Sequence, residues 1–561
     1  MENPTGFDFG TVCVSWKVRE ASGKEQQNVK IEVSLTESFE EVLCVKEGKE
    51  LNSAAEKLEF QQNAHTRYYV RVTVTDDKGE TAVSEPAYFE TGKMEEPWVG
   101  KWITTEKEDT FHPLFVKSFE AKKGLASARL YICGLGLFTA ELNGKKVGDE
   151  VLTPYYSNYH DEEQYITFDI TENVKEQNRL TVSLGNGWFK GKFGLNNQSN
   201  NFGDEFKLIA ELRLVYEDGE VQVIGTDETW EYIGSDVEDD GIYDGEIINH
   251  LLWKEKENLP KKAVLTEAEG KLVARYSLPV MEMEDMQVKE VIYTPLGETV
   301  LDFGQNFAGY VTFRNHLPEG TRIVFDHGEI LQDGNFYNEN YRSAKSQFVY
   351  VSDGRDELVR PSFTYFGFRY VRVTGWPGEA KEEDFTGKAL YSKMDRTGYI
   401  ETGHQGVNRL FLNALWGQKS NFIDFPTDCP QRDERLGWTG DAQVGYLKRF
   451  YEEHHFEEMV PYEPAEMEES ISPFANKLAA ATISRDKTRA LIYYGEMDGM
   501  STPLAGLCDG IYAISWFDPR TGQTEKAEIQ VEVRGKSCIM PKKPAAGDWV
   551  LIAECIEKTE K

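Results

Sequence analysis

The sequence predicts a mainly β, multidomain protein in which tandem β-sandwiches precede a short α-helical segment and a small C-terminal β-sandwich. Its 561 residues are enough for about three to five domains of roughly 100–200 residues each. Alternation of apolar and polar residues, the pattern of half-buried strands, dominates up to about residue 395. Helical periodicity is confined to residues 398–462, after which the strand pattern returns.

Composition narrows the classes of ligand. Hydrophobic residues make up 40% and aromatic residues 12% of the chain, which is enough to fill several packed cores. The formal charge is −34, from 96 acidic and 62 basic residues. Nucleic acids and anionic membrane surfaces repel such a chain, so we expect neither as a partner. A neutral ligand such as a sugar is indifferent to the charge.

The cysteines and the N-terminal stretch predict the compartment. The seven cysteines are scattered, with no CxxC or Cys/His spacing, so structural zinc is not expected, and unpaired thiols suit a reducing compartment. The opening MENPTGFDFG has neither the basic nor the apolar region of a signal peptide. The chain also has no run of 18 apolar residues. We therefore expect a soluble, cytoplasmic protein.

Three β-rich units fill the first 395 residues. In residues 1–95 the stretches VCVSWKV, VKIEVSL and RYYVRVTVTD alternate, with the turn signal DDKGE after the last, as in a small sandwich. In residues 96–287 the turn signals NGK and EDGE divide longer strands. Residues 288–395 hold a third unit, with TVLDFGQNFAGYVTFRN and FTYFGFRYVRVTGWP.

Residues 396–465 change to helical periodicity. The first predicted helix, HQGVNRLFLNALWGQKSNF, has one apolar face, made by Val407, Leu410, Phe411, Ala414 and Leu415. The second, GDAQVGYLKRFYEEHHFEEMV, turns another four apolar residues inward, namely Val444, Leu447, Phe450 and Tyr451. Residues 466–561 return to strands such as GIYAISWFDPRTGQ and DWVLIAECI, which predict a small C-terminal sandwich.

The loop TDCPQRDERLGWTGD, Thr427 to Asp441, concentrates charge between the two predicted helices. A polar helix–helix connection is the commoner explanation of such a run. Against it, Pro426 and Pro430 stiffen the backbone that carries the carboxylates, and the interleaved arginines suit bidentate pairing. Trp438 adds a flat apolar surface for a sugar ring, and a carboxylic acid beside such a ring keeps its proton near neutral pH. The loop therefore has the groups that cleave a glycosidic bond.

This loop closely resembles the signature loop of the bacterial α-L-rhamnosidases, glycoside hydrolase family 78, in which similar loops open a catalytic (α/α)6 barrel. The resemblance extends upstream, through GLGLFTAELNGKKVGDEV and LDFGQNFAGYVTFR, and covers roughly residues 1–460. It implies an Ig/fibronectin-III-like sandwich at 1–95, a carbohydrate-binding-like N-terminal sandwich at 96–287 and a concanavalin-like sandwich at 288–395.

The resemblance also implies roles for five residues of the loop. Glu434 matches the family's general acid, which protonates the glycosidic oxygen. Asp428, Arg432, Trp438 and Asp441 match positions that line the sugar pocket, where the polar side chains bond rhamnose hydroxyls and Trp438 stacks. The family inverts configuration, so a second carboxylate has to activate water on the opposite face. The implied function is cleavage of terminal α-L-rhamnosides.

The helical segment is short for that chemistry. A twelve-helix barrel needs about 200 residues, whereas residues 398–462 number 65 (462 − 398 + 1). We expect a remnant of the barrel, followed at 466–561 by a sandwich that resembles the collagen-binding-like domain of unrelated glycosidases. The unpartnered helices should pack on a sandwich, pair with a second chain as a homo-oligomer, or be partly disordered. The alternative function is an inactive, truncated rhamnoside-binding protein.

No second carboxylate stands out. Four glutamates follow or end the second predicted helix and are more often a solvated face, namely Glu452, Glu453, Glu457 and Glu458. In GNGWFKG we assign Asn186 and Trp188 as possible sugar contacts, because some relatives bind rhamnose there with the help of calcium. A turn rich in Gly and Asn is more often only a turn. We expect no other cofactor and assign no metal ligands; in DHGEIL, strand alternation points Asp326 away from His327, and Glu329 completes no metal site.

Overall fold

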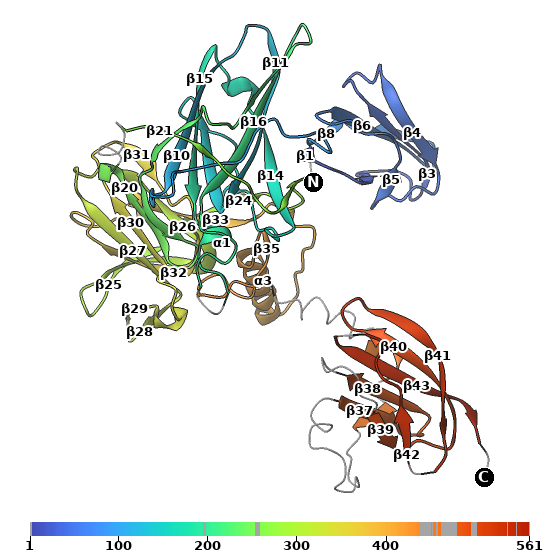
Figure 1. Cartoon of the computed structure of the whole chain (residues 1–561). Coiled ribbons are helices and arrows are strands. Elements are labelled where there is room, and N and C mark those ends of the chain that lie inside the picture. Colours follow the sequence, from blue (N-terminus) through green and yellow to red (C-terminus); the bar gives the residue numbers. More distant parts are fainter. Residues whose placement is uncertain are drawn as a thin grey trace. The chain divides into compact units, whose positions relative to one another are not determined.

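The computed structural model describes most of the chain, and the residues that it describes are 3–194, 198–252, 259–437, 450–451, 453–455, 458–461, 479–494, 502–535, 537–545 and 547–559. They form two compact units, Met1–Gly437 and Trp438–Lys561, which we describe separately. Strands dominate both units (Figure 1), which confirms the mainly β, multidomain prediction. Among the described residues, no helix is both long and apolar enough to cross a bilayer.

The first sandwich forms from the alternating stretches at the N-terminus. Its main sheet runs β1-β8-β6-β3-β4 with β7 beside β6, and β2 pairs with β5. Every second residue of β6 is buried along most of its length, as expected for a strand with one face on a core. The strands are β1 (Thr5–Phe7), β2 (Val12–Val14), β3 (Gln26–Ser34), β4 (Val42–Gly48), β5 (Glu56–Leu58), β6 (Arg67–Asp76), β7 (Thr81–Val83) and β8 (Ala87–Thr91).

Two further sheets make the second sandwich, in the orders β13-β12-β15-β10-β18-β21 and β22-β9-β16-β11-β14-β23, with β17 on β16. Their strands are β9 (Ile103–Thr104), β10 (Pro113–Glu120), β11 (Leu125–Leu135), β12 (Leu137–Leu142), β13 (Lys145–Lys146), β14 (Glu162–Asp169), β15 (Gln177–Gly185), β16 (Lys207–Tyr216), β17 (Val221–Gly225), β18 (Glu231–Gly234), β21 (Lys261–Lys262), β22 (Val264–Leu265) and β23 (Lys271–Ala274). The short helices η1 (Thr171–Asn173) and α1 (Gly187–Lys190) connect them.

One large sheet underlies the site, in the order β19-β20-β30-β27-β32-β26-β33-β24, with β25 and β31 on β26. Its strands β19, β20 and β24 come from residues before 288, so the sheet crosses the expected boundary. The remaining bounds are β19 (Val237–Gly241), β20 (Gly245–Asn249), β24 (Val280–Gln287), β25 (Glu290–Tyr293), β26 (Thr299–Asn315), β27 (Arg322–Gly328), β28 (Ile330–Gln332), β29 (Asn335–Tyr337), η2 (Glu339–Tyr341), β30 (Gln347–Val351), β31 (Glu357–Val359), β32 (Phe366–Thr374), η3 (Glu382–Asp384) and β33 (Phe385–Ser392).

Helix α3 (Gln405–Ser420) is the first predicted helix and packs on β26 and β33. The His404 side chain accepts a hydrogen bond from Val407 N at 3.3 Å and so caps its N-terminus. Leu415 and Trp416 are half-buried, whereas Leu410 is 68% exposed. The helix therefore covers the sandwich with one side only, and part of the predicted apolar face meets solvent. The short strands β34 (Phe422–Ile423) and β35 (Phe425–Pro426) follow.

The second unit is a small β-sandwich, as predicted for the C-terminal residues. Its sheet runs β36-β37-β38-β43-β40-β41, and β39 pairs with β42. Of the second predicted helix, Val444 and Leu447 lie outside the described residues; Phe450 is buried and stacks 4.4 Å from Phe517. The strands are β36 (Met459–Pro461), β37 (Ala479–Ser484), β38 (Arg489–Tyr494), β39 (Thr502–Ala505), β40 (Gly510–Asp518), β41 (Gln523–Val533), β42 (Ser537–Met540) and β43 (Trp549–Lys558).

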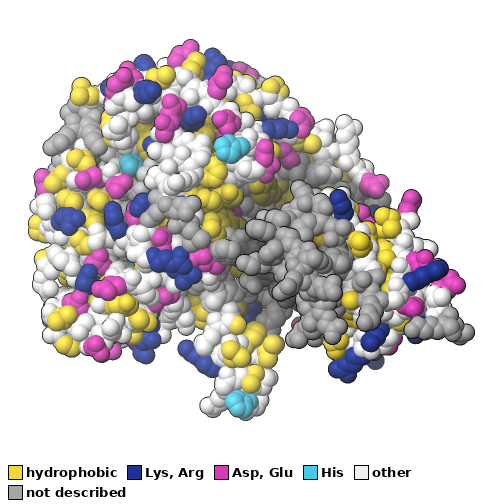
Figure 2. Space-filling view, turned by 60° about the horizontal axis from the view of Figure 1, so that its bottom comes forward, with side chains coloured by type: hydrophobic (Ala, Val, Ile, Leu, Met, Phe, Trp, Pro, Cys, Tyr) yellow, Lys and Arg dark blue, Asp and Glu magenta, His cyan; other side chains and the backbone are white. Residues whose placement is uncertain are grey.

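The surface charge is mixed. On the face drawn in Figure 2, acidic and basic side chains alternate with hydrophobic ones. The net negative charge is therefore not gathered into one patch on that face.

Candidate active site

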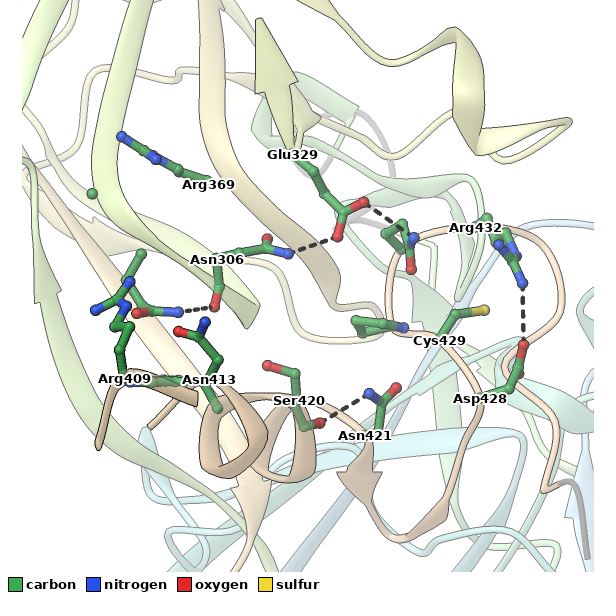
Figure 3. Close-up of a pocket in the computed structure, with 16 residues that line it drawn as sticks. Asn306, Glu329, Arg369, Arg409, Asn413, Ser420, Asn421, Asp428, Cys429 and Arg432 are labelled. Atoms are coloured by element: carbon green, nitrogen blue, oxygen red, sulfur yellow. Dashed lines mark hydrogen bonds and ion pairs between the residues drawn. The ribbon is translucent and has the colours of Figure 1, made fainter. Parts of the chain in front are cut away.

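A cavity of about 540 Å³ lies between the large sheet, helix α3 and the charged loop. In Figure 3, Glu329 lies just after β27 and Arg369 on β32, Arg409 and Asn413 lie on α3, and Asp428 and Arg432 lie on the loop. These three walls are separated by up to about 130 residues in sequence, which only the tertiary fold brings together. The lining residues are Gly304, Gln305, Asn306, Glu329, Arg369, Arg409, Asn413, Trp416, Gly417, Ser420, Asn421, Asp428, Cys429, Pro430, Gln431 and Arg432.

Arg435 holds the loop in place. Its side chain is completely buried, and its guanidinium donates to the carbonyls of Ile242 at 2.9 Å and Tyr365 at 3.0 Å. It also donates to the loop's own carbonyls, at 3.2 Å to Arg432 and 3.3 Å to Gln431. A buried cation needs such partners to offset its lost hydration. The sequence showed Arg435 only as one charge of a cluster, but it is the residue that ties the loop to the large sheet, beside β20 and β32.

Gly367 on β32 lets the loop approach the sheet. A Cβ atom there would lie 2.8 Å from Pro430 Cγ and 2.9 Å from Gln431 Cβ, closer than side chains can pack. On the same side, the Ser346 hydroxyl donates to Gln431 O at 3.1 Å. The loop backbone is thus pressed against the sheet at Pro430 and Gln431, which fixes where the neighbouring side chains point.

Glu434, the predicted general acid, is buried between two arginines. Its Oε2 accepts hydrogen bonds from Arg342 Nη2 at 2.7 Å and Arg432 Nε at 3.2 Å, and its side chain is 8% exposed. Burial alone would raise the pKa of the Glu434 carboxyl, but the hydrogen bonds and charges of Arg342 and Arg432 outweigh burial and leave the pKa below its ordinary value. The two arginines therefore favour the ionised form of Glu434. The predicted neighbour that would favour the protonated form, Trp438, lies outside the described residues.

Asp428 and Asp433 help to shape the loop. Asp428 Oδ1 accepts from Leu436 N at 3.0 Å, and its Oδ2 lies 3.5 Å from Arg432 Nη2. Asp433 is buried and accepts a hydrogen bond from the Ser343 hydroxyl. Asp428 and Arg432 therefore line the cavity as an oriented pair, and their contact with a sugar stays a prediction.

Glu329 is the carboxyl that the sequence did not single out for catalysis. It follows β27 in the DHGEIL stretch and lines the cavity (Figure 3). Asn306 Nδ2 donates to its Oε1 at 2.7 Å and Gln431 Nε2 to its Oε2 at 3.1 Å. Burial raises the pKa of Glu329, although both amide hydrogen bonds and the charge of Arg432 oppose the rise. Glu329 and Asp428 are the carboxyls that line the cavity; Glu434 is not among its lining residues, although it bonds to Arg432, which is. The surroundings of Glu329 and Glu434 shift their pKa values in opposite directions.

Several predicted residues lie outside this geometry. Trp438 and Asp441 fall outside the described residues, as do Glu452 and Glu457. Glu453 and Glu458 are described, and both are exposed. Neither carries a property that marks it as the second carboxylate.

The two predicted sugar contacts of the second sandwich, Asn186 and Trp188, lie in different surroundings. Asn186 lines a polar cavity of about 490 Å³, where its side-chain amide donates to Asp240 O at 2.9 Å. Trp188 is 7% exposed and packs edge-on against Phe193 and Tyr243. Trp188 is therefore a core residue with no ring face for a sugar, which corrects the prediction for it.

Calcium does not fit this cavity as it stands. Calcium takes six to eight oxygen ligands, but the cavity's carboxylates alternate with the amines of Lys190, Lys192 and Lys345. Among the described residues, the groups of three or more metal-type side chains are His250 with Asp353 and Glu357, and Asp428 with Cys429 and Glu434. Neither lies in this cavity. In the second group, arginines already neutralise the carboxylates.

Comparison with known proteins identifies the family. Family models of bacterial α-L-rhamnosidases match three consecutive stretches: the N-terminal domain at residues 123–284, the concanavalin-like domain at 292–391 and the six-hairpin glycosidase domain at 395–459. The chain belongs to the bacterial α-L-rhamnosidase family. A rhamnosidase N-terminal immunoglobulin model matches 1–95, and a collagen-binding domain model of a collagenase matches 471–554.

Individual α-L-rhamnosidases show the same relationship. The chain is 34% identical over 334 residues to one from Streptomyces avermitilis, covering 57% of this chain and 32% of that protein. It is 27% identical over 485 residues to one from Alteromonas sp. strain LOR, covering 80% and 52%. The chain spans about half the length of the curated rhamnosidases it matches, or less.

Solved rhamnosidase structures share the fold. The native enzyme from Aspergillus terreus has a TM-score of 0.73 at 30% identity, over 80% of this chain and 54% of that chain. The Streptomyces avermitilis rhamnosidase complexed with L-rhamnose also has a TM-score of 0.73, at 22% identity over 80% and 62%. At 22% identity, the similarity to the Streptomyces avermitilis structure shows a shared fold and nothing more.

Proposed function

We propose that the chain is a rhamnosidase-type glycoside hydrolase whose loop-walled cavity takes the terminal rhamnosyl unit of a rhamnose-containing glycoside. The observation that carries this proposal is the convergence of Asp428 and Arg432 with Asn306, Glu329 and Arg409 around one cavity of about 540 Å³. A neutral sugar is recognised through fixed hydrogen-bond donors and acceptors, which this cavity supplies from three directions. Family membership supports the same substrate class.

In the proposed reaction, Glu434 protonates the glycosidic oxygen while water attacks the anomeric carbon from the opposite face, with inversion. Glu434 begins as a carboxylate, because Arg342 and Arg432 hold its pKa down. Glu434 therefore has to take up a proton before this step, and its contacts with Arg342 and Arg432 oppose that uptake. No residue is assigned as the base that activates water.

A second candidate function is rhamnoside binding without turnover. Two observations favour it: the match to the six-hairpin domain spans 65 residues (459 − 395 + 1), and Glu434 is held ionised. In that case the cavity keeps its sugar contacts and lacks the pair of carboxyls in the protonation states that hydrolysis needs.

Two assays on the purified chain separate these functions. The first follows hydrolysis of an aryl α-L-rhamnoside by the wild type, by Glu434→Gln and by the control Glu172→Gln, whose side chain is exposed on η1. Activity lost only in Glu434→Gln supports the hydrolase. The second titrates L-rhamnose into the wild type and Asp428→Asn; binding without hydrolysis, weakened in Asp428→Asn, supports the binding protein. If the wild type neither hydrolyses the aryl rhamnoside nor binds L-rhamnose, both proposed functions are refuted.

A further inference from the structure

Two cysteines of the second unit bond to the carbonyl groups of two consecutive residues. Cys508 precedes β40 and its backbone N–H donates to Lys487 O at 2.9 Å. Cys555 lies in β43 and its N–H donates to Thr488 O, also at 2.9 Å. Because Lys487 and Thr488 are consecutive, the backbones of the two cysteines approach each other closely. They are 47 residues apart in sequence (555 − 508).

Tyr512 brings the two thiols together. It lies opposite Cys555 in the β40–β43 pairing, after a register shift at Ile511. The Cys508 Sγ atom is 3.1 Å from the buried Tyr512 hydroxyl. Cys555 Sγ lies beside Gly510, which is two residues from both Cys508 and Tyr512: a Cβ atom at Gly510 would lie 3.0 Å from it. Three polar groups therefore share one small space.

Small reagents can reach both thiols. Cys508 and Cys555 are each half-buried and pack at the edge of the core of the second unit. Burial raises the pKa of Cys555, and the neighbouring Cys508 thiol raises it further. Since the thiolate is the attacking form, exchange at this pair should be slow near neutral pH and faster as the pH rises.

We propose that Cys508 and Cys555 are a modification site that closes to a disulfide when the chain meets an oxidising low-molecular-weight disulfide. The thiolate of one cysteine attacks the reagent's S–S bond and releases one small thiol. The second cysteine, as its thiolate, then attacks the mixed disulfide, forms the protein S–S bond and releases the other small thiol. Two protein thiols are oxidised and one reagent disulfide is reduced, so electrons and protons balance.

Closing this bond would tie the segment before β40 to β43. Both segments are already neighbours in the folded sheet, whereas in the unfolded chain the bond would restrict the 47-residue stretch between them. A cross-link stabilises mainly by limiting the unfolded chain. We therefore expect the unfolding midpoint of the second unit to rise on oxidation and to return on reduction.

The test uses the full chain treated with oxidised glutathione at about pH 8.5, where an ordinary thiol is half ionised. Free thiols are then counted in denaturant, and the peptides are mapped by mass spectrometry without reduction. The expected result is the loss of two of the seven thiols to one cross-link, seen as a peptide containing Cys508 linked to one containing Cys555. Glutathione on the exposed Cys13 removes a further thiol, and the peptide map identifies it separately. Seven remaining thiols, or a cross-link between other cysteines, would overturn the proposal.

Variants separate this pair from general thiol oxidation. Cys538 is also half-buried, and its Sγ lies 3.4 Å from Leu504 O; Cys538→Ser should still lose two thiols to one cross-link. Cys508→Ser should form no cross-link between two of its cysteines, and its remaining Cys555 should instead carry glutathione. If Cys508→Ser does not fold, Cys555→Ser gives the same comparison from the other side. If either of these two variants still loses two thiols to a cross-link, the proposal is wrong.

Discussion

Glu329, which lines the cavity, and Glu434, in the loop beside it, should make opposite contributions to the pH dependence of stability. Glu434 has a lowered pKa and Glu329 a raised one. Stability rises with pH where the unfolded chain binds more protons than the folded chain, and falls where it binds fewer. For Glu434 the unfolded chain binds more protons, so its contribution is complete above the ordinary pKa of 4.5 and fades as the pH falls through the lowered pKa.

The size of the Glu434 effect follows from its contacts. Glu434→Gln keeps one acceptor oxygen but loses the charge that Arg342 and Arg432 face at 2.7 Å and 3.1 Å. A hydrogen bond to a charged group contributes about 1.5–3 kcal/mol. The arginine side chains are 43% and 33% exposed, so solvent screening reduces that figure. We expect Glu434→Gln to lower the free energy of unfolding by about 1–2 kcal/mol at neutral pH.

Glu329→Gln is the matched variant with the opposite sign. Because the pKa of Glu329 is raised in the folded chain, its ionisation disfavours folding as the pH rises above 4.5. Glu329→Gln removes that dependence, so its stability relative to the wild type should improve from acid to neutral pH. Urea unfolding of dilute wild type and both variants, at steps from about pH 7 to pH 3.5, measures both slopes. Equal slopes for the two variants, or a Glu434→Gln deficit that grows in acid, would refute the assignment of these environments.

Three further predictions test the surrounding structure. Arg435→Met leaves two buried carbonyls without their donor and should lower the free energy of unfolding by about 2–4 kcal/mol. The control Arg322→Met, at an exposed position of β27, should change it by no more than about 0.5 kcal/mol. Similar urea midpoints for the two variants would contradict the anchoring role of Arg435. Burial lowers the pKa of His250, but two hydrogen-bonded carboxylates raise it to about 9. His250→Gln should therefore lower the free energy of unfolding by its full amount below pH 6.5, and the difference from the wild type should disappear as the pH rises past 9. Leu410→Ser should change the melting temperature little, because the side chain is 68% exposed, while Trp416→Ser should lower it; a large effect of Leu410→Ser would mean that another chain covers it.

The fold was predictable wherever it depends on local pattern. Strand alternation predicted the sandwiches, and 3.6-residue periodicity predicted α3, because both patterns record which face of an element is buried. The extent of the large sheet was not predictable, since β20 pairs with β30 across about 100 residues. The cytoplasmic location and the absence of nucleic-acid and membrane partners stay predictions.

The sequence predicted several residues of the site, but not the surroundings that determine their protonation. The loop motif gave Asp428, Arg432 and Glu434, but the protonation of Glu434 depends on Arg342, 92 residues earlier. Glu329 was set aside because strand alternation argued against a metal; its burial and its amide partners arise only when β27 meets the loop. Trp188 was assigned as a possible sugar contact from the resemblance, and the sequence does not show Tyr243 packing on it.

The anchors of the charged loop explain why it keeps its shape here. Arg435 bonds to carbonyls at 242 and 365, Pro430 rests on Gly367, and Glu434 O accepts from Tyr243 at 2.7 Å. All of these partners belong to the sandwiches and none to a helix. The sandwiches alone can therefore preorganise the wall that holds Asp428 and Arg432, while among the described residues only α3 forms the facing helical wall. In the proposed function, the anchored loop supplies the sugar contacts and Glu434, whereas no described residue is assigned as the base that activates water. Binding can therefore persist in a chain where cleavage fails.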